Sequence, residues 1–80
     1  MKNNKNLLRG LSTLKEEIID RNTGRKCTVY KAWNMILNAY NGENMSALLR
    51  WVEKRFVMED YQYNVVCNLA KALEIIYVEV

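Results

Sequence analysis

The chain contains no histidine and no proline, and it has only three glycines and two cysteines. Without histidine it lacks the commonest general base and the commonest metal ligand. Cys27 and Cys67 are too few for the disulfide framework of a small secreted domain and lack the close spacing of zinc-binding cysteines. Phosphate-binding glycine loops and dinucleotide fingerprints are also missing. We therefore expect no enzymatic activity, no metal and no cofactor.

Long apolar runs are missing as well, since the longest are only a few residues and a membrane span needs about 20. The lysine-rich start resembles a signal peptide, but Arg9, Lys15 and Glu16 interrupt what would have to be a continuous apolar core. We expect no membrane contact and a cytoplasmic location. Half of the residues are apolar, which is typical of a chain that folds, and a single domain over residues 1–80 is all that this length supports.

Apolar residues recur at three- and four-residue spacing in four segments, which predicts amphipathic helices. These segments are residues 5–21, 28–40, 45–58 and 61–77. Gly24 and Gly42 follow the first two segments and suit the turns that end them. The last two segments could form one bent helix, but we favour a break at residues 58–61, where Asp60 can cap the fourth. The predicted fold class is all-α, a small compact bundle of about four helices.

The third predicted helix carries the first candidate binding surface. Trp51 lies about 120° from the face that the apolar stripe of this helix would bury. Tryptophan and arginine are enriched at binding hot spots. The residues of this surface are Trp51, Arg50, Lys54, Arg55 and Met58. The alternative is that Trp51 is buried by the N-terminal helix or by the segment after Met58.

The second candidate surface is a basic patch around the first predicted turn. Residues 1–31 carry eight Lys and Arg side chains but only Glu16, Glu17 and Asp20 as acidic ones, although the net charge of the whole chain is only +3. The patch consists of Arg21, Arg25, Lys26 and Lys31. Phosphates or an acidic protein surface would both suit it, and a merely solvated surface is the alternative.

The absence of a catalytic set and the aromatic and cationic strip favour a protein that binds another protein stoichiometrically. Frequent Asn, Lys and Ile are typical of AT-rich genomes, so the favoured hypothesis is a phage- or plasmid-type inhibitor or adaptor of a host factor. The tail IIYVEV alternates and could leave the last helix as an extended segment. Ile75 and Val78 fall outside the stripe of the fourth helix, and a homodimer through the C-terminal segment would cover them.

The segments SALLRWVEKR and NLAKALEI resemble the end of the recognition helix and the following helix in the helix-turn-helix domains of phage repressors. The resemblance implies a DNA-binding transcriptional regulator whose recognition helix enters the major groove. It would assign Ser46, Arg50, Lys54 and Arg55 to DNA. The chain departs from the family pattern in the turn NGEN and in a longer helix before it. DNA binding is therefore the alternative to the protein-binding hypothesis.

Overall fold

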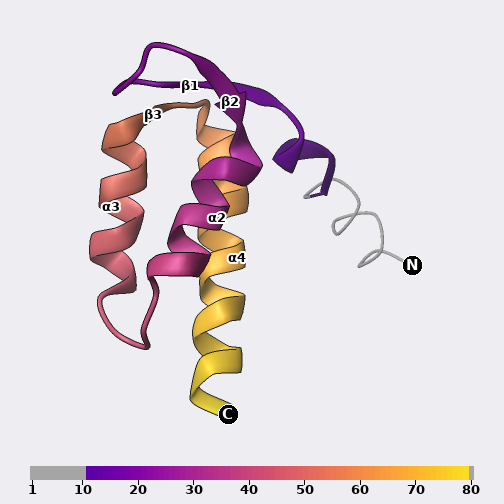
Figure 1. Ribbon diagram of the computed structural model, residues 1–80. Coiled ribbons are helices and arrows are strands. Elements are labelled where there is room, and N and C mark those ends of the chain that lie inside the picture. The colour runs from indigo at the N-terminus through magenta and orange to yellow at the C-terminus, as the bar shows by residue number, and fades with distance from the viewer. Residues whose placement is uncertain (1–10, 80) are drawn as a thin grey trace.

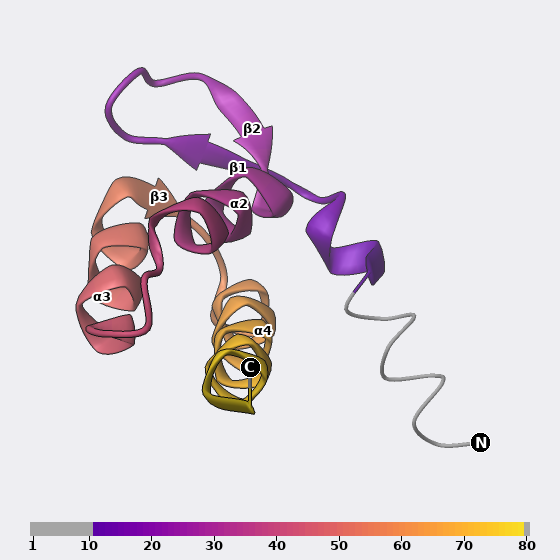
Figure 2. The same ribbon diagram turned by 60° about the horizontal axis from the view of Figure 1, so that its bottom comes forward.

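The computed structural model describes the backbone of residues 11–79 and the side chains of residues 11–77. After a helical turn at residues 11–14, the elements follow in the order β1 (Glu17–Asp20), β2 (Lys26–Thr28), α2 (Val29–Ala39), α3 (Met45–Arg55), β3 (Phe56–Val57) and α4 (Asp60–Glu79). The helices α2 and α4 run in the same direction, and α3 runs in the opposite one (Figures 1 and 2). The strands form an antiparallel sheet in the order β2-β1-β3 at the end of the helices where α3 stops.

This sheet makes the fold mixed α/β, although mostly helical, so the all-α prediction is wrong. The first predicted helix, at residues 5–21, is the reason, because its C-terminal part is strand β1; residues 5–10 lie outside the described residues. The buried Ile18 and the exposed Ile19 point to opposite faces of the sheet, which is the period of a strand. Adjacent β-branched residues fit this pleated, half-buried surface better than a helix.

Gly24, expected to lie in the turn that ends the first helix, has a φ of +70 but closes a β-hairpin and does not end a helix. The N–H of Asp20 donates to the carbonyl oxygen of Arg25 at 2.9 Å, and the N–H of Gly24 donates to the carbonyl oxygen of Asp20 at 2.7 Å. The Asp20 carboxylate accepts the N–H of Asn22 at 2.9 Å, an arrangement that stabilises the turn. The turn residues that were expected to end a helix therefore reverse the chain direction, and the chain continues as the antiparallel strand β2.

The helix α3 ends at Arg55, three residues before its predicted end at Met58. Phe56 takes an extended conformation and pairs with Asp20, and Val57 pairs with Ile19. Met58 consequently lies beyond the helix. Because β3 separates α3 from α4, the alternative of one bent C-terminal helix is wrong, and the break falls close to where we expected it.

The cap of α4 is Glu59, not Asp60 as predicted. The side-chain oxygen of Gln62 accepts the N–H of Glu59 at 2.8 Å, and the N–H of Tyr63 donates to the Glu59 carbonyl oxygen at 3.0 Å. This is half of a capping box, in which the third helical residue reaches back to the cap. At its other end α4 continues to Glu79, so the prediction of an extended tail is wrong for residues 75–79.

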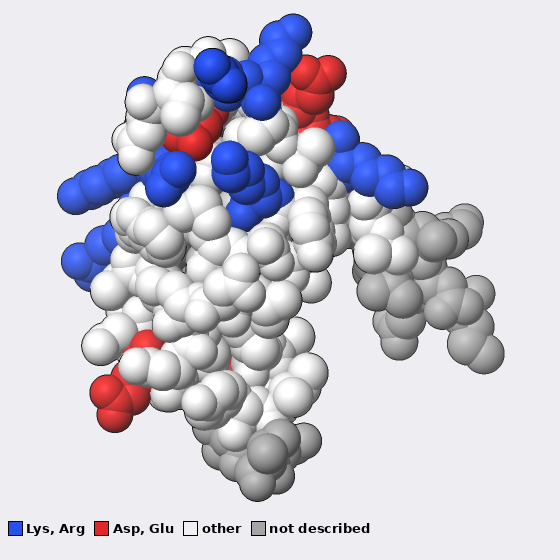
Figure 3. All heavy atoms as spheres, in the orientation of Figure 1, with Lys and Arg blue, Asp and Glu red and all other residues white. Residues whose placement is uncertain are grey.

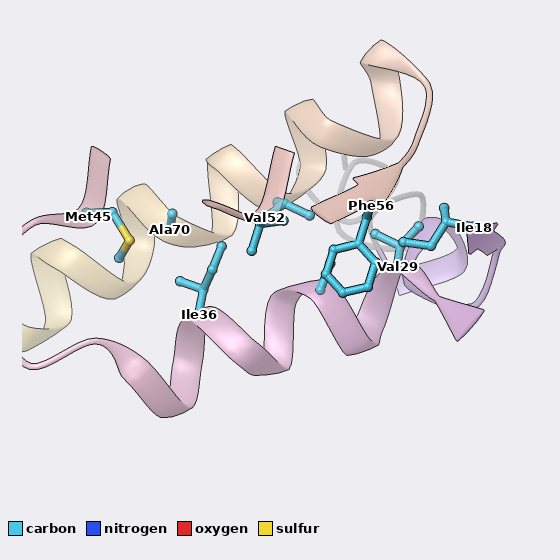
Figure 4. Packing of buried hydrophobic residues seen from close by; sticks show 9 residues of the cluster. Ile18, Val29, Ile36, Met45, Val52, Phe56 and Ala70 are labelled. Carbon is cyan, nitrogen blue, oxygen red and sulfur yellow. The ribbon is translucent and has the colours of Figure 1, made fainter. Parts of the chain in front are cut away.

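Nine buried apolar residues from α2, α3, α4, β1 and β3 form one core among the described residues (Figure 4). They are Ile18, Val29, Ala32, Ile36, Met45, Val52, Phe56, Val66 and Ala70. Trp33 packs against this cluster but stays partly exposed. The core thus joins the sheet to the helices and fixes the position of the hairpin relative to α3.

Gly42, in the connection between α2 and α3, is a position where we expect a side chain to be costly. Its φ is +99, and an added Cβ would lie 2.7 Å from the Cε1 atom of Tyr77. The Tyr77 ring would have to leave the Tyr40 ring, whose centroid is 5.1 Å away. Gly42→Ala should therefore lower the free energy of unfolding, measured by urea denaturation, by about 1–3 kcal/mol.

Gly24→Ala is the matched control for that experiment, because Gly24 also has a positive φ but no atom lies within 4 Å of an added Cβ. It measures backbone strain alone, about 1–2 kcal/mol. If both variants lose the same stability, the contact with Tyr77 contributes nothing. If Tyr77→Ala abolishes the difference between them, the ring is its cause.

Candidate functional site

Trp51 lies on the solvent-facing side of α3, where 42% of the residue is exposed. Trp51 does not belong to the buried core cluster of the described residues. Residues 5–10 of the predicted N-terminal helix, which could have covered it, lie outside the described residues. Arg50 precedes it, and Lys54 lies one turn further along the same helix; both are exposed. Residues three positions apart are neighbours on a helix surface, so Trp51 and Lys54 form a continuous aromatic and cationic strip.

Arg55 and Met58 do not extend this strip. The Arg55 guanidinium turns to Asp20, with Nη2 3.1 Å from Oδ2 and Nε 3.3 Å from Oδ1, and it also lies over the ring of Phe56, 5.6 Å from its centroid. Met58 follows β3 and packs against the core. Both residues thus serve the fold. No local pattern could reveal this for Arg55, because Asp20 lies in a distant part of the sequence.

The Asp20–Arg55 pair anchors the hairpin to the end of α3. Asp20 is only 1% exposed, and both of its carboxylate oxygens accept hydrogen bonds from the guanidinium. Hydrogen bonding to Arg55 lowers the pKa of Asp20, while burial opposes this; the N–H of Asn22 and the charges of Arg55 and Lys31 lower it further. Lys31 itself lies in the first turn of α2 and is exposed.

The hairpin brings the predicted basic patch against α3. Arg21 Nη1 donates to the carbonyl oxygen of Lys54 at 2.9 Å, and the N–H of Arg21 donates to the carbonyl oxygen of Arg55 at 2.8 Å. A cation at a helix C-terminus also complements the helix dipole. Arg25 is exposed in the turn, and Lys26 makes only a long contact of 3.9 Å with the exposed Glu17. The two predicted surfaces are therefore contiguous at the end of α3.

We call this combined surface the basic face. It consists of Trp51, Arg50, Lys54, Arg21, Arg25, Lys26 and Lys31, all exposed. On the side of the molecule that Figure 3 shows, Lys and Arg gather over the sheet end, and the opposite end carries almost none. An exposed indole with Arg50 and Lys54 on the same helix can bind an anionic or acidic surface by packing and by charge.

A second polar cluster, not predicted from the sequence, ties the start of β1 to α4. The Glu16 carboxylate accepts hydrogen bonds from the hydroxyl of Tyr61 and, at 2.9 Å, from Nε2 of Gln62. These bonds lower the pKa of Glu16, and the bond to Glu16 raises the pKa of Tyr61. Because Glu16, Tyr61 and Gln62 are hydrogen-bonded to one another, the cluster stabilises the fold and offers no free acid or base.

The Cys27 thiol is not activated as a nucleophile. Burial raises the pKa of the Cys27 thiol, and the positive charge of Lys31 only partly opposes this. Near Cys67, burial is the main cause that raises the pKa of Tyr63 to about 12, and its hydroxyl donates to the carbonyl oxygen of Leu49 at 3.2 Å. A phenol with this pKa is not a general base near neutral pH.

Among residues 11–77, no group of Cys, Asp and Glu side chains is arranged to hold a metal ion. No helix in that part of the chain combines the length and the apolar character that a membrane span requires. Comparison of the sequence and the fold with protein-family models, curated proteins and solved structures finds no match, so function must be argued from the basic face itself.

Proposed function

We propose that this protein acts by stoichiometric binding, docking its basic face on an acidic surface of another protein. The observation that carries the proposal is the exposed Trp51 beside the cations of the hairpin and of α3. Tryptophan buries a large area when a partner covers it, and surrounding cations speed the encounter with an acidic surface. The AT-rich codon bias implied by the composition fits a phage or plasmid factor that inhibits or adapts a host protein.

DNA binding is the second candidate, because the cations on the hairpin could contact phosphates. The arrangement of the helices supports it less. The helices of a helix-turn-helix meet at about 90–120° and are joined by a turn of three or four residues. Here α2 and α3 lie antiparallel, and residues 40–44 connect them (Figure 1). The resemblance to phage repressors therefore rests on sequence and not on this geometry.

Trp51→Ala tests the protein-binding proposal. Because Trp51 is largely outside the core, the variant should change the free energy of unfolding by less than about 1 kcal/mol, whereas capture of an acidic host protein should fall to background. Leu37→Ala is the matched control, since Leu37 is also 42% exposed but lies on α2 outside the basic face. Equal capture by wild type and Trp51→Ala would exclude Trp51 as a binding anchor.

Nuclease treatment and a salt series separate the two candidates. Capture that survives nuclease and is lost in Trp51→Ala supports a protein partner. Anisotropy with mixed double-stranded DNA between about 50 and 200 mM salt should show feeble binding if the proposal is right, because a protein that reads phosphates loses affinity steeply over this range. Tight, strongly salt-dependent DNA binding that requires Arg21 and Arg25 would overturn the proposal in favour of DNA.

A further inference from the structure

The C-terminal turns of α4 carry apolar side chains that the rest of the described chain leaves uncovered. Ile75 is 60% exposed and Ile76 is 58% exposed. The 20 residues of α4 span about 30 Å, nearly twice the length of the 11-residue α2 and α3. The end of α4 therefore extends past the connection between α2 and α3, as Figure 1 shows.

The bundle can cover only one side of this extension. Tyr77 lies on that side, because its ring contacts the ring of Tyr40 and closely approaches Gly42. At 100° per residue, Ile75 points about 160° away from Tyr77. A side chain in that direction points away from the bundle and is open to contact with another molecule.

The side of α4 that carries Ile75 also carries one positive and one negative side chain, Lys71 and Glu74. Lys71 lies four residues before Ile75 and three before Glu74, so it neighbours both of them on the helix surface. No ion pair joins Lys71 to Glu74. Lys71 and Glu74 also line an open groove between α3 and α4, whose apolar lining comes from Met45, Leu49 and Cys67. An apolar residue, a cation, an anion and a groove thus lie together on this side.

We propose that two copies of the chain associate through this side of α4, with the two α4 helices antiparallel about a two-fold axis. In such an isologous contact, if Lys71 of one copy faces Glu74 of the other, the reverse pair forms at the same time. Ile75 of each copy then packs over the groove of the other. A parallel arrangement would instead place like charges opposite each other.

The distribution of charge over the molecule also favours a second copy as the occupant. The basic face lies at the sheet end, and the extension of α4 lies at the opposite end (Figures 1 and 3). Contact through the C-terminal turns keeps the two basic faces apart and free, so their mutual repulsion is screened over that distance. The inference is independent of the proposed function, which uses the other end. The side chain of Val78, expected to join Ile75 in such a contact, lies outside the described residues.

Sedimentation velocity over a concentration series tests the dimer with the full chain. Wild type should show a reversible monomer–dimer equilibrium. Lys71→Glu and Glu74→Lys should each weaken the dimer about tenfold, because two attractive contacts become repulsive. An equimolar mixture of the two variants should regain the wild-type dimer. In the mixed dimer, both contacts across the two-fold axis join a carboxylate of the first variant to an ammonium group of the second.

Ile75→Asp should also abolish the dimer while leaving the helical circular dichroism unchanged, because the residue does not contact the core. Leu37→Asp is its control, as an exposed leucine outside the contact, and should dimerise like wild type. A wild-type chain that stays monomeric at every concentration would overturn the proposal. So would single charge variants that dimerise normally, or a mixture that fails to restore the dimer.

Discussion

Replacing Phe56 with alanine should give the largest loss of stability of any single truncation in the core, about 3–5 kcal/mol. Native domains are stable by only about 5–15 kcal/mol, so a large share of the total would be lost. Phe56 is fully buried, forms β3 with its backbone and receives the Arg55 guanidinium over its ring. Figure 4 shows it packed near Val29 at the sheet end of the core.

Urea denaturation of Phe56→Ala beside Val57→Ala gives the measurement its control. Val57 belongs to the same short strand and pairs with Ile19, but its side chain faces solvent. Its truncation should change the free energy of unfolding by about 0.5 kcal/mol or less. Equal losses in the two variants would mean that Phe56 does not anchor the sheet to the helices, and the placement of β3 would be wrong.

The helices that depend on local signals were the predictable part of this fold. Residues 28–40 were predicted as a helix and α2 occupies Val29–Ala39, because apolar spacing and the Asn41 and Gly42 stop lie within the same short stretch. The centre of α4 was likewise predicted. Periodicity of this kind is readable from one sequence because it reflects which face of a helix meets the core.

The sheet could not be predicted, since its strands are too short for alternation to be visible. β3 is two residues long and exists because Asp20 and Ile19, far away in the sequence, supply its hydrogen-bond partners. The pair Ile18 and Ile19 satisfies a helical stripe as well as a strand. Only tertiary pairing distinguishes the two, because the β-strand preference of a residue depends on its neighbours across the sheet.

In the candidate site, too, the features set by local sequence were predictable and those set by distant residues were not. The phase of Trp51 relative to the apolar stripe is a local property, and the residue is exposed as that phase indicates. The direction of the Arg55 side chain depends on Asp20, which is distant in the sequence. The contact between Arg21 and Lys54 depends on a hairpin that the sequence did not predict. Two patches that looked separate along the chain therefore became one basic face.

The second large effect is expected from the two ways of breaking the Asp20–Arg55 pair. Arg55→Met leaves a carboxylate that is almost completely buried without its guanidinium, and an unpaired buried charge is strongly destabilising. Asp20→Asn leaves Arg55, whose side chain is 25% exposed and can turn to water. At neutral pH, Arg55→Met should therefore have the lower melting temperature, although each variant removes the same ion pair.

Both variants should approach wild type in stability as pH falls, but they should do so over different pH ranges. Hydrogen bonds from Arg55 lower the pKa of Asp20 in the folded state, so the pair stabilises the protein above the unfolded value of about 3.9, and this is lost as pH falls through the folded pKa. The stability difference between wild type and Asp20→Asn should thus shrink on acidification. In Arg55→Met, burial without a partner raises the pKa of Asp20, so protonation relieves the unpaired charge and the variant should gain stability as pH falls from neutral.

Thermal denaturation across a pH series checks this. Each variant is compared with wild type at the same pH, so that the contributions of Glu16 and the other carboxylates to the pH dependence cancel. Parallel curves for the two variants would mean that the Asp20 carboxylate reaches water, and that core packing alone holds the hairpin on α3.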